Sequence, residues 1–405
     1  MQSKHYDIII VGAGLLGSSL ACALQQTGLK IAIIDAKSMI SAKTPENRDI
    51  RSIALSLASC NILKNIGFTS IFTNSATPIK RIHVSDKGHF GFTRLNAADY
   101  DLTAFGYVIP YHLLVSEFME KISAAKAIDT FAPATVQSID LQTNSARCQI
   151  EYAEQKITLE TNLLIAADGS HSFARKQLNL ATQQQDHQQQ ALVANVGIIS
   201  DTFDIAYERF CDSGIIALLP QKLHQYGLVW TDKNSHIESM LALNDDAFLQ
   251  HLQSHFGYRL GRFTWIGKRF NYPLQTIFTQ EQAKPHFLLL GNAAHTVHPV
   301  AAQGFNLGLR DLAELLATIE LMSKDNAIGK IELLNDFITK RIQDQQRIVR
   351  FTHSLINTFK NPLASVKFTR NMALNLLDGL PSLKRSFAFR SMGFNPPVPE
   401  FAYCE

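Results

Sequence analysis

The chain is organised around residues 6–35, which read YDIIIVGAGLLGSSLACALQQTGLKIAIID. The β-branched run Tyr6–Val11 predicts a buried parallel strand. A G-x-G-x-x-G pattern follows it, Ser18–Thr27 has a helical pattern, and Leu29–Ile34 predicts a second strand that ends at an acid. Strand, glycines, helix, strand and acid in this order predict a nucleotide-binding βαβ unit. The alternative is a glycine-rich turn in an ordinary βαβ unit.

Each residue of this pattern has its own physical task. Gly12 permits the tight turn after the strand, Gly14 lets the backbone approach a pyrophosphate, and Gly17 lets helix and strand pack closely. Asp35 lies where a carboxylate can accept a hydrogen bond from a ribose hydroxyl. Only one such fingerprint occurs. We therefore expect one bound dinucleotide, with a second nucleotide that visits or is absent.

The composition is that of a globular protein. A length of 405 residues suggests two or three domains, or one large discontinuous one, and a net charge of +3 does not suggest nucleic-acid binding. Five scattered cysteines without a C-x-x-C pair indicate reduced thiols in an intracellular protein, and we expect no metal site. No apolar run reaches ~18 residues, so we predict no membrane span. The N-terminal apolar run superficially resembles a signal peptide, but its ordered glycines favour a strand.

A second informative stretch is residues 291–311, GNAAHTVHPVAAQGFNLGLRD. Phe287–Leu290 before it predicts a buried strand, Pro299 marks a loop, and a helical pattern begins near Gly304. A helix N-terminus offers free N–H groups and about half a positive charge. A loop this rich in small residues would let a flat ligand lie on the backbone. The alternative is a plain connection between two core elements.

The remaining segments predict a second, mostly antiparallel sheet and several helices. Strands are expected in a hairpin over 82–93 and over 134–141, 148–161, 191–199, 205–210, 215–220 and 226–230. Helices are expected over 49–63, 111–128, 245–255 and, as one or two helices, 330–360. The glutamine-rich run 183–190 is interpreted as the crossing between domains.

Two further segments carry functional hypotheses with open alternatives. A strand over Leu163–Ala166 is followed by Asp168-Gly169, which can place a carboxylate or backbone near the cofactor or can form a simple β-turn. The tail Asn361–Asn395 carries five basic residues against one acid, with Leu and Phe between them. Such a helix can lie on anionic lipid, or it can pack on the main body or on a partner subunit.

Three separated motifs now agree: the glycine fingerprint with Asp35, the series Asp168-Gly169…Ser172…Arg175, and the stretch 291–311. Together they resemble the single-component, FAD-dependent aromatic hydroxylases of the para-hydroxybenzoate hydroxylase fold. Within that group the chain is most similar to the ubiquinone-biosynthesis hydroxylases. The finer resemblance rests on RIHVSDKGH (81–89), YERF (207–210) and GNAA (291–294).

The resemblance implies an α/β fold with an α+β second domain. A Rossmann-like FAD-binding domain of the glutathione-reductase type would carry an inserted antiparallel-sheet substrate domain and C-terminal helices. The expected boundaries are 1–75, 100–180 and 275–345 for the FAD-binding domain, 76–99 and 181–274 for the substrate domain, and 346–405 for the C-terminal helical region.

The resemblance also implies roles for residues, with FAD as cofactor and NAD(P)H as transient co-substrate. The expected FAD contacts are Gly12, Gly14 and Gly17 (pyrophosphate), Asp35 (ribose), Arg51 (pyrophosphate and ribityl chain), Asp168 (FAD and pyridine nucleotide), Asn292 (ribityl chain), and Pro299, Gln303, Gly304, Phe305 and Asn306 (isoalloxazine). His298 and Arg209 are the candidate catalytic residues. Two positions depart from the wider family: Asn292 replaces the common Asp, and Ala302 replaces a common Gly, where a Cβ narrows the space or restricts φ.

The implied reaction is reduction of FAD by NAD(P)H, followed by transfer of oxygen from a C4a-hydroperoxyflavin to an electron-rich phenol. Partners would be a prenylated phenol and O2, with no nucleic acid. A cytoplasmic location fits, with association with the inner membrane or a ubiquinone-biosynthesis complex and a homo-oligomeric state left open. The alternatives are hydroxylation at another ring position or of another apolar aromatic, a related reductase or halogenase, and a non-catalytic flavin-binding subunit that holds a lipid.

Overall fold

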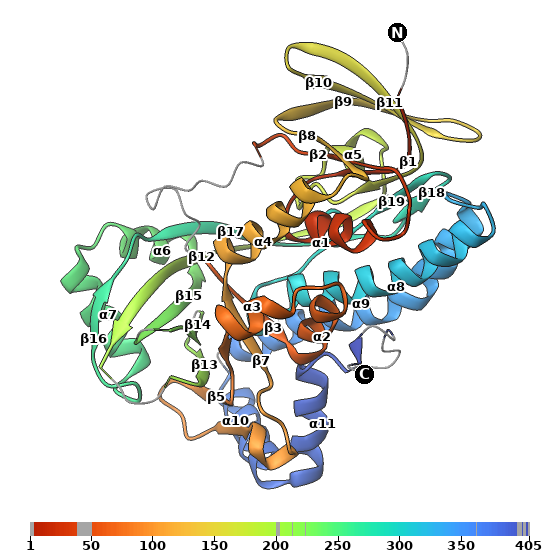
Figure 1. The fold of residues 1–405 in the computed structure, drawn as a ribbon. Coiled ribbons are helices and arrows are strands. Elements are labelled where there is room, and N and C mark those ends of the chain that lie inside the picture. The colour runs from red at the N-terminus through yellow and green to blue at the C-terminus, as the bar shows by residue number, and fades with distance from the viewer. Residues whose placement is uncertain are drawn as a thin grey trace.

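Two large β-sheets and one small sheet carry the fold, and helices cover them (Figure 1). The structure is a computed structural model that describes residues 4–38, 51–199, 203–212, 214–222, 224–361, 363–394, 399 and 402–403. Within this part of the chain, every helix is too short or too polar to span a bilayer.

The first sheet has the parallel core that the opening stretch predicts. Its neighbouring strands are, in order, β18 (Ala283–Lys284), β19 (Phe287–Leu289), β11 (Gln155–Ala166), β1 (Lys4–Val11), β2 (Ile31–Ile34) and β8 (Ile128–Phe131). From β19 to β8 the strands run parallel. Their carboxyl ends therefore meet at one edge, where ligands of open α/β sheets bind. The α/β fold is confirmed.

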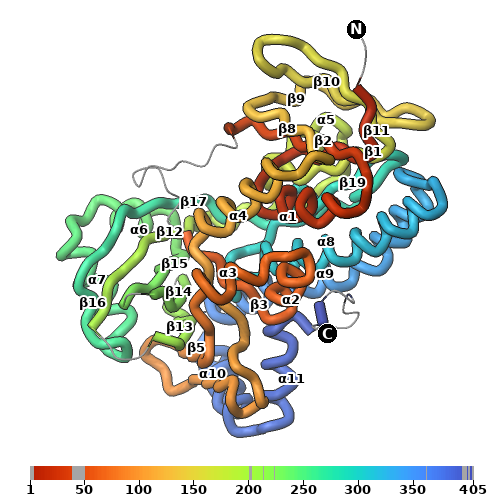
Figure 2. Tube along the Cα trace, in the orientation of Figure 1, coloured from red at the N-terminus to blue at the C-terminus, as the bar shows by residue number. Residues whose placement is uncertain are grey.

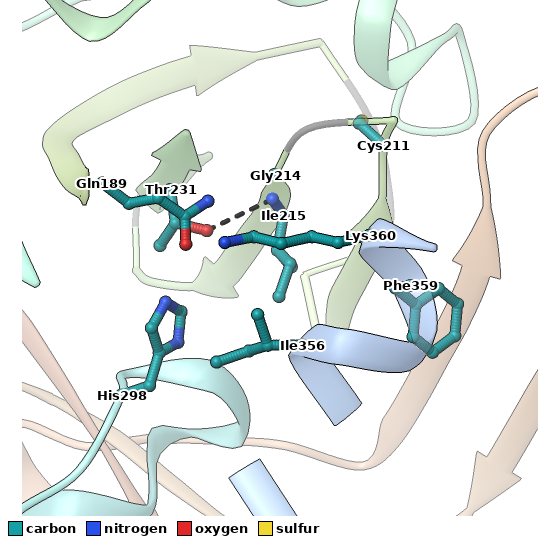
Figure 3. A pocket seen from close by; sticks show the side chains of 9 residues that line it. All are labelled: Gln189, Cys211, Gly214, Ile215, Thr231, His298, Ile356, Phe359 and Lys360. Atoms are coloured by element: carbon teal, nitrogen blue, oxygen red, sulfur yellow. Dashed lines mark hydrogen bonds between the residues drawn. The ribbon is translucent and has the colours of Figure 1, made fainter. Parts of the chain in front are cut away.

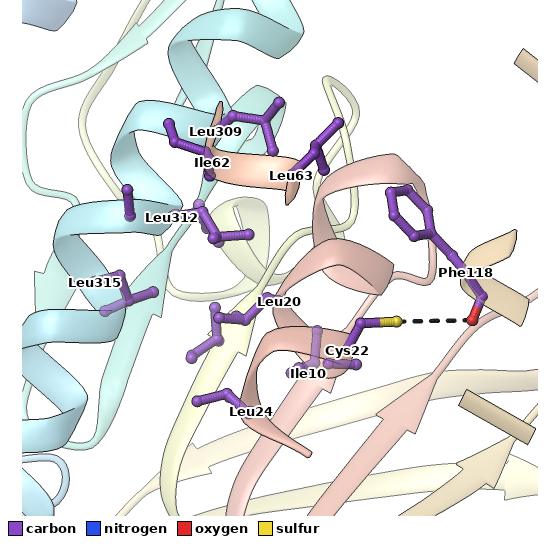
Figure 4. Packing of buried hydrophobic residues seen from close by; sticks show 14 of the residues in the cluster. Ile10, Leu20, Cys22, Leu24, Ile62, Leu63, Phe118, Leu309, Leu312 and Leu315 are labelled. Carbon is purple, nitrogen blue, oxygen red and sulfur yellow. Dashed lines mark hydrogen bonds between the residues drawn. The ribbon is translucent and has the colours of Figure 1, made fainter. Parts of the chain in front are cut away.

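Helices pack on one face of this sheet through a continuous apolar core. They are α1 (Leu15–Leu24), α2 (Leu57–Asn65), α4 (Tyr111–Ala124) and α8 (Gln303–Lys324). Leu309, Leu312 and Leu315 of α8 follow helical spacing and face Leu20 and Leu24 of α1 (Figure 4). This packing fixes the direction of α8 and therefore the place of its N-terminus.

The helix predicted over 49–63 is wrong in its first half. Residues 49 and 50 lie outside the described part of the chain. Ser52–Ser56 is strand β3, which pairs with β7 (Gly106–Pro110), and β7 also pairs with β4 (Thr77–Pro78) in the small sheet. The backbone of Ser56 is extended, and its side chain accepts from the N–H of Ser59, so this residue ends the strand and caps α2.

Two other boundaries are corrected by pairing between distant residues. The helix predicted over 111–128 ends at Ala124, because Ile128 pairs with Ile31 in the first sheet. The single strand predicted over 148–161 is a hairpin of β10 (Ala146–Tyr152) and β11, turning at residues 153–154, both of which have positive φ. Neither turn residue is a glycine, so the sequence carries no turn signal there. The strand β9 has the predicted bounds, Ala134–Leu141.

The second sheet is mostly antiparallel, as predicted. Its order is β20 (His295–Thr296), β17 (Phe270–Thr279), β12 (Thr182–Ile198), β15 (Gln225–Lys233), β14 (Ile215–Pro220), β13 (Ile205–Phe210), β5 (Arg81–Asp86) and β6 (Phe92–Asn96), with β16 (Phe263–Ile266) also on β12. The predicted hairpin is β5–β6. The run 183–190 lies inside β12 and pairs with β17 across a bulge. It is an extended strand, because backbone pairing rather than side-chain composition decides its conformation.

The remaining helices surround these sheets. They are α3 (Thr69–Asn74), α5 (Phe173–Gln177), α6 (Asn234–Leu241), α7 (Asp245–Phe256), α9 (Ile331–Lys360), α10 (Ala364–Gly379) and α11 (Pro381–Ser391). The segment predicted as one or two helices is the single helix α9. Figure 2 shows α10 and α11 at the end of the molecule opposite to the β9–β10 hairpin. The domain boundaries stay a prediction.

Candidate functional site

Two helices begin at the site with N-termini that no side chain caps. Gly14 precedes α1 and Ala302 precedes α8, and neither helix has an acid in its first turn. In α7, by contrast, the side chain of Asn244 accepts from the N–H of Ala247. The first N–H groups of a helix have no partner within the helix. Both open ends therefore favour a ligand that carries negative charge.

The three glycines of the fingerprint differ in what surrounds them. A Cβ built at Gly12, whose φ is +102°, would lie 2.5 Å from the carbonyl oxygen of Ala167. A Cβ at Gly17 would lie 1.9 Å from the carbonyl oxygen of Gly12, whereas one at Gly14 would meet no atom within 4 Å. Packing therefore requires glycine at the first and third positions, and Gly14 borders open space at the start of α1.

Two carboxylates border the same turn. Asp35 accepts from the N–H groups of Ala13 (2.6 Å) and Lys37 (2.7 Å) and so holds the glycine turn against the end of β2. Asp168 accepts from the N–H of Ala174 through Oδ2, while its buried Oδ1 has no partner among the described residues. A buried acceptor of this kind calls for a donor, and a ligand hydroxyl can supply one.

The three sequence motifs meet in space. The guanidinium of Arg175 donates to the carbonyl oxygens of Ala293 (2.7 Å) and Ser170 (2.6 Å). A Cβ at Gly291 would lie 2.3 Å from Cδ2 of Leu16 on α1, so the backbone packs there without a side chain between. The glycine turn, the Asp-Gly segment and the stretch 291–311 thus form one site at the carboxyl edge of the first sheet.

The loop before α8 holds two consecutive left-handed residues. Ala301 has φ 57° and ψ 21°, and Ala302 has φ 49° and ψ 37°. For residues with a Cβ this conformation costs about 1–2 kcal/mol each. Two hydrogen bonds hold it: the N–H of Ala301 donates to Oε1 of Glu208 (3.1 Å), and Nδ2 of Asn306 donates to the carbonyl oxygen of Ala302 (2.6 Å). The sequence predicts that the Cβ of Ala302 narrows the space or restricts φ. In the structure, Ala302 has a strained, left-handed backbone.

Strand β3 is tied to the same loop. Asn306 accepts from the N–H of Ser56 (2.9 Å) and donates to the carbonyl oxygen of Ala54 (3.0 Å). Arg51, next to β3, packs over the rings of Tyr111 (4.7 Å) and Tyr272 (5.2 Å). Since Tyr111 belongs to α4, which packs on the first sheet, and Tyr272 belongs to β17 of the second sheet, Arg51 lies between the two parts of the fold.

Comparison with known families and structures agrees with this geometry. A model of the FAD binding domain family matches residues 5–352. The chain belongs to this family. FAD fits the site: the open space at Gly14 and the uncapped start of α1 suit its pyrophosphate, and the unpartnered oxygen of Asp168 suits one of its hydroxyls.

The similarity to known proteins extends over nearly the whole chain. Ubiquinone hydroxylase UbiL of Rhodospirillum rubrum is 30% identical over 400 residues, which cover 98% of this chain and 92% of UbiL. The 3-demethoxyubiquinol 3-hydroxylase of Escherichia coli is 25% identical over 397 residues, which cover 97% of this chain and 100% of that hydroxylase. In structure the chain is similar to p-nitrophenol 4-monooxygenase PnpA of Pseudomonas putida, with a TM-score of 0.78 at 14% identity. The matched residues cover 96% of this chain and 99% of PnpA. This last likeness concerns the fold.

The other predicted FAD contacts lie along the same loop. Asn292 is exposed within the short 3-10 turn Gly291–Ala293, and Pro299, Gly304 and Phe305 are half-buried. The side chain of Gln303 turns back to the carbonyl oxygen of Ala301 (3.1 Å). The structure thus places these residues beside the uncapped start of α8, while their contacts with FAD stay a prediction.

His298 is buried at the loop. The N–H of Val300 donates to its Nδ1 (3.3 Å), which leaves the imidazole proton on Nε2, an atom without a partner in the described part of the chain. Figure 3 shows the ring at a small cavity that Thr231 and Lys360 also line. Burial lowers the pKa of His298 to about 3, so the imidazole is neutral.

Arg209 and Glu208 lie on opposite faces of β13, because neighbouring residues of a strand alternate. Arg209 donates to the carbonyl oxygen of His255 (3.0 Å) on α7, whereas Glu208 meets Ala301 in the loop before α8. Burial raises the pKa of Glu208 above its ordinary value. Glu208 therefore contacts the loop before α8, and the catalytic role of Arg209 stays a prediction.

Sequence reasoning missed Glu208 although it lies inside the YERF segment. The signal that could have found it is alternation: position 208 shares its strand face with the buried Ala206 and Phe210, and a lone acid on an apolar face needs a partner. Sequence reasoning also missed a buried charge network in which Asp311 and Asp344 pair with Arg341. Arg341 and Asp344 have the i,i+3 spacing of a helix pair on α9, but Asp311 lies on α8 and no spacing rule links it to them.

Proposed function

We propose that this FAD-dependent aromatic monooxygenase hydroxylates a polyprenylated methoxyphenol in ubiquinone biosynthesis, with NAD(P)H and O2 as co-substrates. The substrate class is supported by the full-length similarity to ubiquinone hydroxylases. The segments 81–89, 207–210 and 291–294 favour similarity to 2-polyprenyl-6-methoxyphenol hydroxylase. The structural observation that carries the proposal is the unpartnered oxygen of Asp168 at an open glycine turn, where the three motifs meet.

In this proposal the chain binds FAD through backbone more than through charge. Gly12, Gly14 and Gly17 let the pyrophosphate approach the start of α1, and Asp35 and Asp168 accept from hydroxyl groups. When bound, FAD would supply the redox chemistry, in which NAD(P)H is the reductant and O2 gives one oxygen atom to the aromatic ring and the other to water. The uncapped start of α8, beginning at Gln303, stabilises the negative charge that reduction brings to the ring system.

The loop contributes position and proton control. Arg51 and Asn292 would contact the pyrophosphate and ribityl parts of FAD, and the segment from Pro299 to Asn306 would border its ring. His298 stays neutral and can donate from Nε2 without adding charge next to an apolar substrate. Glu208 fixes the N–H of Ala301 and thereby the wall of the site. Arg209 remains a second candidate, acting from the other face of β13.

The decisive experiment is product identification by mass spectrometry. The purified, FAD-loaded chain is supplied with 2-polyprenyl-6-methoxyphenol, NAD(P)H and O2. A product with one added oxygen on the ring supports the proposal. Because one relative is a 3-demethoxyubiquinol 3-hydroxylase, oxygen at another ring position would favour that alternative. If no substrate is hydroxylated and substrate does not accelerate NAD(P)H oxidation, the chain is a flavin-binding subunit and the proposal fails.

We also propose a cytoplasmic protein that works at the periphery of the inner membrane, alone or in a ubiquinone-biosynthesis complex. Support comes from the apolar prenyl chain of the proposed substrate, which resides in lipid. Sedimentation of the native lysate tests this location, and size-exclusion chromatography with light scattering measures the oligomeric state. Recovery entirely in the membrane-free fraction under low salt would contradict the peripheral location.

A further inference from the structure

Helix α10 presents its polar side to the protein. Oδ1 of Asn371 accepts from the N–H of Gly91 (2.8 Å), and Oδ1 of Asp378 accepts from the N–H of Arg94 (2.9 Å). Asn375 accepts in the same way between them. The N–H groups of Phe92 and Arg94 belong to the outer edge of β6, the last strand of the second sheet, and Gly91 directly precedes this strand. The polar residues of α10 thus cover a sheet edge that would otherwise expose unpaired donors.

The apolar side of the same helix faces outward. Its large side chains recur every four residues and therefore lie in one row. The row, here called the α10 ridge, consists of Phe368 (59% exposed), Met372 (49%), Leu376 (56%) and Leu380 (41%). Phe90 in the β5–β6 turn contacts Phe368 at a ring distance of 6.3 Å, and Leu383 of α11 is also exposed. A surface helix ordinarily buries its apolar stripe, so this arrangement is reversed.

The charge around the ridge is positive. Residues 361–394 carry five basic side chains and one acid. Three of the basic residues are paired within the fold: Arg370 with Asp86 (2.8 Å), Lys384 with Asp378 (2.9 Å) and Lys367 with Asp212 (3.7 Å). The one acid of this segment, Asp378, is therefore already paired with Lys384. Arg385 and Arg390 are exposed at the surface of α11.

A row of exposed apolar side chains such as the α10 ridge indicates an interaction surface. An anionic bilayer is the occupant that matches both features, because acyl chains accept the apolar row while phosphate headgroups attract the flanking cations. Figure 1 shows α10 and α11 projecting at one end of the molecule, where a flat surface can reach them. We propose that the α10 ridge, flanked by the exposed Arg385, docks this end of the molecule on an anionic lipid surface. The docking does not depend on which ring the enzyme hydroxylates.

The test uses vesicle flotation of the full, FAD-loaded chain. Vesicles contain phosphatidylcholine alone or with phosphatidylglycerol. The ridge variant combines Phe368→Ser, Met372→Ser and Leu376→Ser. The control replaces three exposed apolar residues elsewhere, namely Ile199→Ser (70% exposed), Tyr258→Ser (70%) and Leu321→Ser (52%). Flavin absorbance and the thermal midpoint of each variant show whether the fold is intact.

The wild-type chain and the control should float with phosphatidylglycerol vesicles, less with phosphatidylcholine alone, and less at high salt. The ridge variant should bind about tenfold or more weakly, with unchanged flavin content, because three buried contacts with the bilayer are lost. Equal flotation of the ridge variant and the wild type would overturn the proposal. So would a dimer in sedimentation velocity that only the ridge variant converts to monomer, because the ridge would then belong to a second copy of the chain.

Discussion

Gly14 is the residue at which binding and folding can be separated. A Cβ at this position meets no atom within 4 Å, whereas at Gly17 it would lie 1.9 Å from a backbone oxygen. Gly14→Val should therefore fold but lose FAD, because the side chain occupies the approach of the pyrophosphate. Gly17→Val should fail to fold. Visible absorbance and circular dichroism of the two purified variants check this pair, and a fully yellow Gly14→Val protein would refute the assigned role.

Ala302 holds strain that glycine would relieve. At φ 49° its Cβ costs about 1–2 kcal/mol, part of which glycine gives back through the entropy of the unfolded chain. Ala302→Gly should therefore raise the free energy of unfolding by about 0.5–1 kcal/mol in urea titrations. As a control, Ala373→Gly in the exposed part of α10 should lower it by about 1 kcal/mol. Equal destabilisation by both changes would argue against the strained loop.

Glu208 makes the free energy of unfolding depend on pH, and the direction of its pKa shift sets the sign of that dependence. Burial raises the pKa of this carboxyl, so the folded state binds its proton more tightly than the unfolded state, whose Glu pKa is about 4.3. Between these two pKa values the stability contributed by Glu208 falls as the pH rises. Glu208→Gln keeps an acceptor for the N–H of Ala301 but cannot ionise.

Relative to Glu208→Gln, the wild-type chain should therefore lose stability as the pH rises through that window and show a constant difference outside it. Denaturant titrations of both proteins at a series of pH values measure the difference. A difference that stays flat, or that changes in the opposite direction, would mean that the carboxyl is not desolvated at the loop.

At the scale of elements, α8 and α9 are joined by buried charges. Asp344 accepts from Arg310 (2.8 Å) and Arg341 (2.6 Å), and Asp311 accepts from Arg341 (2.7 Å) and His295 (2.6 Å). His295 belongs to the GNAAH segment, so the network ties α9 to the loop that is predicted to bind FAD. Burial raises the pKa of Asp344, but the two arginines outweigh it and hold that pKa below its usual range.

Removing one member of this network should be costly. Asp344→Ala leaves the buried guanidinium of Arg310 without its counter-charge, while Arg341 keeps only Asp311. We therefore expect a loss of about 3–5 kcal/mol in the free energy of unfolding. The surface pair Lys340–Glu314 joins the same two helices (2.7 Å), and Lys340→Ala should lose less than about 1 kcal/mol. Urea titration of the two variants measures both, and similar losses would show that the buried network is not the main link between these helices.

At the scale of the whole molecule, FAD should connect elements that are far apart in the chain. The site gathers β1, β11, β3 and the start of α8, and none of these is assembled in the unfolded state. A ligand that binds only the folded protein stabilises it by about 2.7 kcal/mol at a concentration of 100 Kd. Removal of FAD should therefore lower the thermal midpoint, and added FAD should raise it in a concentration-dependent way.

Riboflavin is a suitable control for that experiment, because it has the ring and ribityl chain but no pyrophosphate. It should shift the midpoint much less than FAD if the starts of α1 and α8 bind the phosphates and ring as proposed. A midpoint that does not depend on FAD would mean that the site is not assembled around the cofactor.

The sequence alone determined the features that depend on neighbouring residues. The strand Tyr6–Val11, the glycine turn and the helix after it follow from local conformational preference and periodicity, and so do β9 and α7. The family motifs are also local, which is why the sequence suffices to predict FAD as the cofactor. The contacts of the single site residues stay predictions.

Only the tertiary structure decided the features that depend on distant partners. Residues 52–56 are a strand because β7 lies beside them, and the glutamine-rich run is extended because β17 pairs with it. Glu208 meets Ala301 across 93 positions, and the polar side of α10 turns inward because the edge of β6 offers donors there. Backbone pairing and desolvation act between residues that the chain order separates, so local pattern does not specify them.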